Sequence, residues 1–252
     1  MLPIERKNAI LQRLMLDGRV IVAELAESYG VTEETIRRDL EKLESEGYAK
    51  KTYGGAVRNE SMTLELPYTV RKQTNVSGKK YIAERIGALI TDGNSLLLDS
   101  STTALFTVKS IFEKQNLTII TNSVEILLDL PQGKGWSVIS TGGTYRAEEM
   151  AFSGSVAERT VSSYHVDYAI LSCKGIDLQK GITDTREPFA ELKQAFIKSA
   201  RKVILAVDHT KFDQISFVHL DDFRGIDIIV TDLEPNEQWK QLFTEMQIEL
   251  YY

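Results

Sequence analysis

The amino-acid sequence predicts a small helical domain at the N-terminus, followed by a larger α/β domain with a mainly parallel sheet. In residues 1–58, apolar side chains recur at helical spacing and are interrupted by short glycine-containing turns. From Ser77 onward, short apolar runs alternate with helical stretches, as in domains whose strands pair in parallel. Residues 59–76 show no clear periodicity and are interpreted as a linker. The predicted domains therefore cover residues 1–58 and 77–252.

The composition predicts an ordinary cytoplasmic protein. Of the 252 residues, 42% are hydrophobic and 26% are charged, which are usual values for a globular chain. No apolar run has the length of a membrane span, and the N-terminus has no signal-peptide core, so no membrane partner is expected. The single cysteine, Cys173, excludes an intrachain disulfide and fits a reducing compartment. The three histidines are too scattered for a metal site, and no cofactor is expected.

Three helices are predicted in the N-terminal domain. The first spans residues 4–17 and ends before Gly18, and the second ends before Gly30. Thr32 then lies where its hydroxyl can cap the third helix by accepting a hydrogen bond from an early backbone N–H. The inward side chains repeat at helical spacing and are Ile10, Leu11 and Leu14 in the first helix, Val22, Leu25 and Ala26 in the second, and Ile36, Leu40 and Leu43 in the third.

The outward face of the third helix carries side chains that suit the major groove of DNA. Arginine can bind guanine edges or phosphates through two parallel hydrogen bonds, and threonine can contact a thymine methyl group or a phosphate. The alternative is a solvated helix whose charges pair with each other, as Glu34 and Arg38 would. The residues of this helix expected to contact DNA are Thr32, Thr35, Arg37, Arg38 and Lys42.

A predicted hairpin follows the third helix and adds a wing to it. Lys50 and Lys51 precede Tyr53 and the turn Gly54-Gly55, and all three side chains are expected to contact DNA. The stretch TIRRDLEKLESEGYAKKTYGGA, residues 35–56, resembles the signature of the DeoR family of bacterial transcriptional regulators. The resemblance implies a winged helix-turn-helix that binds a double-stranded DNA operator. The sequence departs from the family's pattern at Tyr53, where a histidine usually precedes Gly-Gly.

The charge of the N-terminal domain bears on how it would bind DNA. The chain has a net charge of −6, but residues 1–58 hold ten basic and ten acidic residues. The remainder therefore carries 20 of the 30 basic and 26 of the 36 acidic residues, and with them the whole excess. A neutral module can bind DNA if its charges are segregated onto one face, with modest and salt-sensitive affinity. A homo-oligomer, either a dimer or a tetramer, would compensate by binding two half-sites.

Six strands are predicted in the C-terminal domain. Each is a short and nearly all-apolar run, as expected for parallel strands that are buried on both faces. A helix is expected before them at 77–90, and further helices at 103–114, 123–130 and 188–200. The tail beyond Asp232 is interpreted either as a closing helix and strand or as a subunit contact. The predicted strands are residues 95–99, 117–121, 136–140, 168–172, 202–207 and 227–231.

Polar and small residues follow the predicted strands, at the edge where open α/β sheets bind ligands. The hydroxyl-rich loop 99–103 lies directly before a helix, whose free N–H groups suit a phosphate. Lys174 and Lys211 add positive charge to two other loops. One such loop alone would be ordinary helix capping, but several on one edge favour a pocket for a polar ligand. The loops are residues 99–103, 121–123, 140–143, 172–175 and 208–212.

This part of the chain resembles the DeoR-type sensor domain, whose fold is similar to ribose-5-phosphate isomerase and which commonly responds to phosphorylated sugars. The resemblance implies phosphate contacts from Thr102, Thr103 and Ser123. It implies a border to the sugar from Lys174, Asp177, Glu191 and Lys193. The expected ligand-binding residues are Asp99, Ser101, Thr102, Thr103, Thr121, Asn122, Ser123, Gly142, Gly143, Lys174, Gly175, Asp177, Glu191, Lys193, Asp208 and Lys211. The implied function is a ligand-responsive repressor of a sugar-metabolism operon.

Two alternatives to this function stay open. Sugar-phosphate isomerisation needs a carboxylate that moves a proton beside the carbonyl, and the candidate bases are Asp177, Asp184, Glu187 and Glu191. The isomerase pattern, however, has Gly-Ala-Asp-Glu where this chain has Ser-Cys-Lys-Gly at 172–175, so no catalytic residue is expected. The other alternative is a regulator whose pocket no longer binds a small molecule. Glu191 and Lys193 could equally be exposed helix residues.

Overall fold

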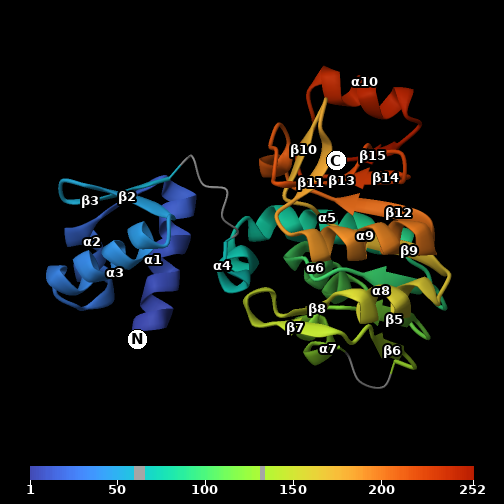
Figure 1. Ribbon diagram of the computed structural model, residues 1–252, viewed down its shortest axis with the longest axis horizontal. Coiled ribbons are helices and arrows are strands. Elements are labelled where there is room, and N and C mark those ends of the chain that lie inside the picture. Colours follow the sequence, from blue (N-terminus) through green and yellow to red (C-terminus); the bar gives the residue numbers. More distant parts are fainter. Residues whose placement is uncertain (60–65, 131–133) are drawn as a thin grey trace. The chain divides into compact units, whose positions relative to one another are not determined.

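The computed structural model describes residues 1–59, 66–130 and 134–252. These residues form two compact units, Met1–Thr74 and Asn75–Tyr252, each with its own hydrophobic core (Figure 1). Within the described ranges, no helix is long and apolar enough to cross a bilayer.

The N-terminal unit combines three helices with a three-stranded antiparallel sheet. Helices α1 (Pro3–Asp17), α2 (Val22–Tyr29) and α3 (Glu33–Ser45) confirm the three helices predicted from periodicity. Strands β2 (Ala49–Thr52) and β3 (Gly55–Arg58) form the predicted hairpin, and the short β1 (Arg19–Ile21) pairs with β3. A Cβ atom at Gly55 would lie 2.0 Å from the carbonyl oxygen of Val20, so the close approach of β1 and β3 requires glycine.

Part of the predicted linker 59–76 forms a helix. Helix α4 (Tyr68–Gln73) packs against α1, and Val70 is buried in the N-terminal core. The side chain of Gln12 donates a hydrogen bond to the carbonyl oxygen of Gln73 at 3.2 Å. Pro67, with a φ of −50° and a ψ of 144°, is the residue that precedes this helix. Residues 60–65 of the predicted linker lie outside the described part of the chain.

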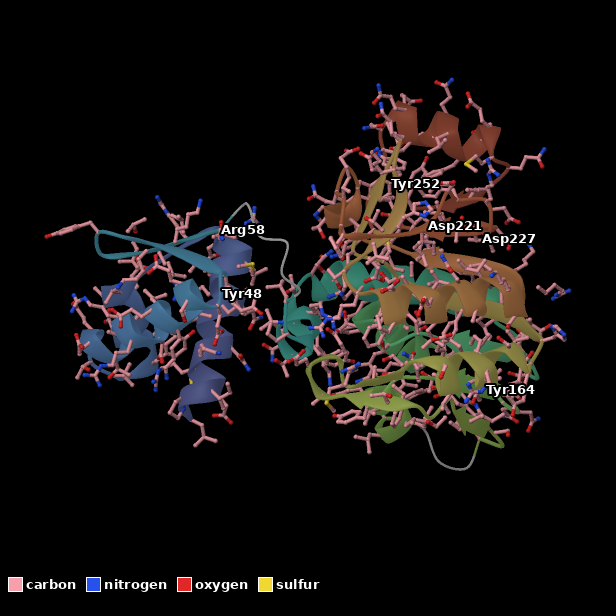
Figure 2. The ribbon with its side chains drawn as sticks, in the orientation of Figure 1. Tyr48, Arg58, Tyr164, Asp221, Asp227 and Tyr252 are labelled. Atoms are coloured by element: carbon pink, nitrogen blue, oxygen red, sulfur yellow. The ribbon has the colours of Figure 1, made fainter. Side chains whose placement is uncertain are left out.

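The C-terminal unit is built on a seven-stranded parallel sheet, in the order β15-β14-β12-β9-β4-β5-β6. All six predicted strands are present, and the tail supplies the seventh after helix α10 (Glu237–Glu245). Asp227, marked in Figure 2, accepts a hydrogen bond from the Val203 N–H at 2.7 Å and so joins two neighbouring strands. The strands are β4 (Ser95–Leu98), β5 (Thr118–Thr121), β6 (Ser137–Ser140), β9 (Val166–Leu171), β12 (Ala200–Ala206), β14 (Ile228–Val230) and β15 (Glu249–Tyr251).

Burial of the sheet follows the position of each strand. In the central β4, Leu96, Leu97 and Leu98 are fully buried, as expected for a strand covered on both faces. The expectation of burial on both faces is wrong for β6, which lies at the edge and is mostly exposed. The helices pack in pairs, α5 with α6 and α8 with α9. Their bounds are α5 (Val76–Leu89), α6 (Thr102–Ser110), α7 (Val124–Leu128), α8 (Ser155–Ser162) and α9 (Glu187–Ser199).

Short elements that the sequence analysis does not predict are inserted between these strands. Three of them form a small antiparallel sheet, in the order β10-β11-β13, and two form a hairpin, β7 with β8. The 3-10 helices η1 and η2 follow β7 and β12. The bounds are β7 (Thr144–Arg146), η1 (Ala147–Glu149), β8 (Ala151–Ser153), β10 (Gly175–Asp177), β11 (Gly181–Asp184), η2 (His209–Lys211) and β13 (Val218–Asp221).

Candidate nucleic-acid interface and ligand site

The start of α3 is fixed by two threonines. Thr32 Oγ1 accepts a hydrogen bond from the Thr35 N–H at 3.3 Å, which confirms the predicted cap. The two hydroxyl oxygens are 2.9 Å apart and also share a hydrogen bond. Thr32 is exposed and Thr35 is half-buried. The inward stripe of the helix is fully buried, so the helix presents its other face to solvent.

The exposed basic residues of α3 are paired with glutamates one turn earlier. Arg37 Nη2 lies 2.6 Å from Glu33 Oε2, and Arg38 Nε lies 3.3 Å from Glu34 Oε1. The intrahelical pairing considered as an alternative is therefore present in the unbound chain. Such exposed pairs stabilise a helix by only about 0.2–0.5 kcal/mol each, so both arginines can exchange partners. Lys42 is exposed near the end of the same helix.

The wing presents an aromatic residue at its tip and lysines on both faces. Tyr53 is fully exposed in the turn between β2 and β3. Lys50 and Lys51 are consecutive in β2 and therefore point to opposite faces. Lys51 Nζ lies 2.9 Å from Glu41 Oε1, and the Lys51 N–H donates to Glu44 Oε1 at 2.8 Å. The hairpin is thus bound to α3, which fixes the wing beside the helix.

The N-terminal unit contains a buried ion pair that the sequence analysis does not predict. Arg6 Nε of α1 donates to Asp39 Oδ2 of α3 at 2.6 Å, and both residues are buried. The available signal was the position of Asp39, which follows Ile36 by three residues and therefore lies on the inward side of the helix. The pair connects α1 to the helix that carries the predicted DNA contacts.

The C-terminal unit brings the first predicted loops together at the carboxyl edge of its sheet. Asp99, directly after β4, is buried and accepts hydrogen bonds from the backbone N–H groups of Ser101 and Ser172, each at 2.9 Å. Its carboxylate therefore joins the ends of β4 and β9. Ser101 caps α6, and Thr102 and Thr103 are buried in the first turn of that helix.

The Thr-Asn-Ser loop after β5 is mostly engaged in the fold itself. Thr121 Oγ1 donates to the Leu98 carbonyl oxygen at 2.8 Å, and Ser123 caps α7. Asn122 Nδ2 donates to the Phe152 carbonyl oxygen at 2.9 Å. Its Oδ1 is buried without a hydrogen-bond partner among the described residues. Of the three side chains, Asn122 therefore retains a free acceptor.

Lys193 occupies the centre of the polar residues at this edge. Lys193 Nζ, from α9, donates to Asp184 Oδ2 at 2.6 Å and to the Ser172 carbonyl oxygen at 2.7 Å, and lies 3.6 Å from Asp99 Oδ2. Burial alone would lower the pKa of Lys193, but the two carboxylates raise it above its usual value. The alternative of an exposed lysine is therefore wrong for Lys193, whereas Glu191 on the same helix is exposed.

Burial lowers the pKa of the neighbouring Lys174 to about 7, although the nearby Asp184 carboxylate acts in the opposite sense. When an anion binds beside a lysine whose charged form is disfavoured by burial, the pKa of that lysine rises. Burial also raises the pKa of the Cys173 thiol to about 12, so this cysteine is not a nucleophile at neutral pH. This segment therefore offers no reactive thiol, and an anion bound beside Lys174 would favour the charged form of that lysine.

The pKa of Lys174 has a measurable consequence for stability. Above the folded-state value of about 7 and below the unfolded-state value of about 10.4, the unfolded chain binds more protons than the folded chain. We therefore expect the contribution of Lys174 to the free energy of unfolding to rise with pH through this window. Lys174→Met should flatten the rise, measured by urea unfolding at pH 7, 8 and 9. Identical slopes in both proteins would contradict a lowered pKa.

The remaining predicted ligand residues are spread over several loops and mainly hold turns. Asp177 accepts hydrogen bonds from two backbone N–H groups of the β10–β11 turn, and Asp208 caps η2. Gly143 has a φ of 110°, and a Cβ there would lie 2.7 Å from the Ser153 carbonyl oxygen. The other three positions are Gly142 in the loop after β6, Gly175 at the start of β10 and the half-buried Lys211 in η2.

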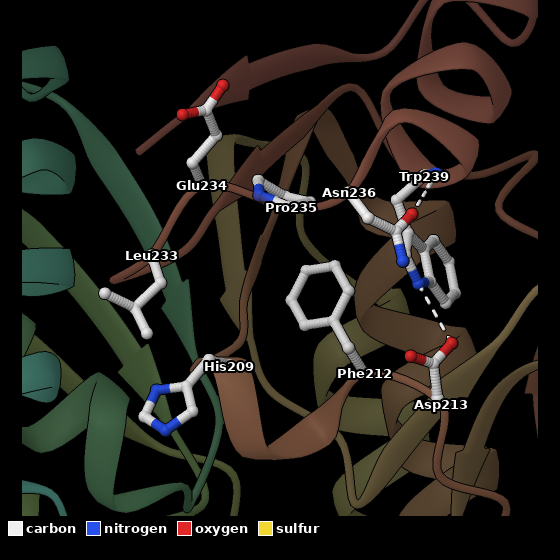
Figure 3. Close-up of a pocket in the computed structure, with 8 residues that line it drawn as sticks. All are labelled: His209, Phe212, Asp213, Leu233, Glu234, Pro235, Asn236 and Trp239. Atoms are coloured by element: carbon white, nitrogen blue, oxygen red, sulfur yellow. Dashed lines mark hydrogen bonds between the residues drawn. The ribbon is translucent and has the colours of Figure 1, made fainter.

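A pocket of about 180 Å³ lies beside η2 and contains none of the predicted ligand residues. Figure 3 shows His209 and Leu233 on one side, with Phe212 and Trp239 on the other. Next to it, the Asp232 carboxylate accepts a hydrogen bond from Asn75 Nδ2 and one from the His209 N–H, at 2.9 Å and 2.7 Å. Asp232 therefore joins η2 to the start of α5. The sequence alone does not predict this contact, because Asn75 and Asp232 are 157 residues apart.

Comparison with known proteins assigns both units. Residues 6–62 match the family model described as the DeoR-like helix-turn-helix domain, and residues 74–233 match the DeoR C terminal sensor domain. The chain belongs to the DeoR family. Its members are DNA-binding transcriptional regulators rather than enzymes, and the resemblance seen in the sequence is confirmed.

Several DeoR-family regulators are similar over almost their whole length. The uncharacterized HTH-type transcriptional regulator YulB of Bacillus subtilis is 38% identical over 232 residues, covering 92% of this chain and 90% of that protein. The transcriptional repressor AccR of Agrobacterium fabrum is 33% identical, covering 90% and 89%. The glycerol-3-phosphate regulon repressor of Escherichia coli is 29% identical, covering 98% and 97%. Among solved structures, ribose 5-phosphate isomerase from Methanocaldococcus jannaschii overlaps 55% of each chain, with a TM-score of 0.40 and 14% identity.

Proposed function

We propose that this DeoR-family protein represses a carbohydrate-metabolism operon and responds to a phosphorylated sugar bound at the carboxyl edge of its C-terminal sheet. In this proposal residues 1–58 bind the operator, residues 77–252 sense the effector, and the segment 59–76 joins them. The protein acts in the cytoplasm as a homo-oligomer, either a dimer or a tetramer, because paired modules match the two half-sites of an operator.

The observation that carries the effector class is the cluster of three lysines at this edge, of which Lys193 is buried and the other two are half-buried. Lys174, Lys193 and Lys211 are close enough to influence one another, and the carboxylates of Asp184 and Asp99 lie beside Lys193. The buried hydroxyls of Thr102 and Thr103 lie in the first turn of α6, where helix N–H groups favour an anion. A phosphorylated sugar supplies both the negative charge and the hydroxyls that such a site can bind.

The names of similar proteins support the repressor and carbohydrate parts of the proposal. Besides the glycerol-3-phosphate regulon repressor, a putative aga operon transcriptional repressor of Escherichia coli O157:H7 is 32% identical over 230 residues. The coupling between effector and operator requires that the effector binds the DNA-competent and DNA-incompetent states with different affinities.

The direct test is fluorescence anisotropy with DNA from upstream of the protein's own gene. The duplex is titrated at two salt concentrations, and a panel of sugar phosphates is then added to the preformed complex. Specific binding that one compound disrupts would support the whole proposal. If none of the compounds changes DNA binding, the proposed phosphorylated-sugar effector is contradicted. If the protein binds a scrambled duplex equally well, the proposed operator binding is contradicted.

Arg38 offers the sharpest mutational test of the DNA-binding surface. We expect Arg38→Ala to weaken binding to the upstream duplex by about 1–3 kcal/mol, since an arginine that contacts a base contributes about that much. Effector binding, measured by calorimetry, should be unchanged because Arg38 is an exposed residue of the other unit. Arg159→Ala, an exposed arginine on α8, is the matched control. Equal losses from both variants would place the DNA contact elsewhere.

A further inference from the structure

Two glutamates of α3 hold the two arginines that are predicted to contact DNA. Arg37 is 2.6 Å from Glu33, and Arg38 is 3.3 Å from Glu34, in each case one helical turn away. A third pair of the same kind binds the wing to α3. In the unbound protein, carboxylates of the helix itself therefore neutralise part of the surface that would approach DNA.

These ion pairs open easily, but their carboxylates stay in place. The four side chains are between 49% and 71% exposed, so water screens each pair, and closing it costs side-chain entropy. A phosphate or a guanine edge can therefore take over either arginine. The carboxylate that is released remains beside the DNA, where a nearby phosphate repels it.

The position of the glutamates makes this repulsion selective. Glu33 and Glu34 form the first turn of α3, and the N-terminal residues of a recognition helix are those that reach base edges. A carboxylate there can accept a hydrogen bond from the amino group of cytosine, but it has no favourable contact with a phosphate. On non-target DNA, an arginine that leaves its glutamate finds mainly phosphates to bind. In a matching site, base edges provide additional hydrogen bonds for that arginine.

We propose that Glu33 and Glu34 are specificity-determining residues that weaken binding to non-target DNA. Arg37 or Arg38 can bind a phosphate only by leaving its glutamate, and the freed carboxylate then repels that phosphate. In a matching site, base contacts offset this cost. The inference rests on the proposed binding of α3 to DNA. The proposal also explains why residues 1–58 hold as many acidic as basic residues, ten of each. A more basic surface would bind any duplex, whatever its sequence.

The test compares the full chain with Glu33→Gln and Glu34→Gln on two duplexes, one from upstream of the gene and one scrambled. Glutamine keeps the size and nearly the helix propensity of glutamate. On the scrambled duplex, each variant should bind more tightly, and its slope of log affinity against log salt should steepen by about 0.9, the effect of one added phosphate contact. The slope on the upstream duplex should not change. An unchanged slope on the scrambled duplex, or equal steepening on both, would overturn the proposal.

Two controls separate position from net charge. Glu27→Gln makes the same change in charge on α2, where Glu27 is exposed and has no ion pair among the described residues. It should leave both slopes at the wild-type values, and steepening as large as that of Glu34→Gln would overturn the proposal. Adding Arg38→Ala to Glu34→Gln should abolish the steepening, because the freed arginine causes it. A different result would contradict the proposed function itself: the wild-type protein would bind the upstream duplex no more tightly than the scrambled duplex.

Discussion

Replacing Lys193 by methionine is expected to lower the free energy of unfolding of the C-terminal unit by about 3–5 kcal/mol. The Lys193 ammonium lies 2.6 Å from Asp184 Oδ2 and 3.6 Å from Asp99 Oδ2, and both aspartates are 2% exposed. Methionine has a similar volume but removes the ammonium group that lies between the two buried carboxylates. Urea unfolding followed by tryptophan fluorescence reports on this unit alone, because Trp136 and Trp239 are the only tryptophans of the chain.

The pH dependence of the variant tests the cause of this loss. Burial would raise the pKa of Asp184, but Lys193 and Lys174 hold it below its usual value, so the wild-type protein loses stability as pH falls through that lowered pKa. Without Lys193, burial should raise the pKa of Asp184 above the unfolded-state value of about 3.9. The folded variant then binds protons more readily than the unfolded chain and gains relative stability as pH falls. The difference between the two proteins should therefore narrow from pH 8 to pH 5.

A second lysine of the same helix provides the control. Lys198 is exposed near the end of α9, and Lys198→Met makes the same chemical change. We expect it to alter the free energy of unfolding by no more than about 0.5 kcal/mol, the usual range for a surface substitution. Equal losses at the two positions, or a difference that does not narrow at low pH, would show that Lys193 does not neutralise the aspartates.

The large elements of the fold could be predicted from the sequence because their patterns are local. In helix α3 the apolar residues Ile36, Leu40 and Leu43 recur at helical spacing, and the run that forms β4 is almost purely apolar, so each carries its own signal. The strands β10, β11 and β13 carry no such signal, because glycine or polar residues interrupt the apolar run in each of them. The sequence also does not show which strand lies at the edge of the sheet, so it predicts burial for β6, which is mostly exposed.

In the candidate sites, too, local features could be predicted from the sequence, and contacts between distant residues could not. Features that depend on local position could be predicted, such as the cap that Thr32 provides for α3 and the place of Tyr53 in the wing turn. Partners that are distant in sequence were not found. Arg6 and Asp39 are 33 residues apart, and Asn75 and Asp232 are 157 apart. No periodicity connects such positions, since only the packed fold brings them together.

The second large effect is expected in the N-terminal unit, from Arg6→Met. Arg6 and Asp39 are buried and joined at 2.6 Å, and they connect α1 to α3. Loss of the arginine should lower the free energy of unfolding by about 3–5 kcal/mol. A unit of 74 residues has a total of roughly 4–11 kcal/mol, so much of its stability would be lost. DNA binding should fall with it, and the tryptophan transition should stay unchanged because both tryptophans lie in the other unit.

The double variant Arg6→Met/Asp39→Leu distinguishes a structural role of Arg6 from a DNA contact. A buried ion pair can often be replaced by apolar residues without loss of stability, whereas either single change leaves one buried charge alone. We therefore expect Asp39→Leu to be about as damaging as Arg6→Met, and the double variant to recover most of the loss in far-ultraviolet circular dichroism melts. DNA binding should recover too, because both side chains are buried. Arg13→Met on α1 is the exposed control. If stability returned without DNA binding, Arg6 would itself have to reach the DNA, and the ion pair would not be what positions α3.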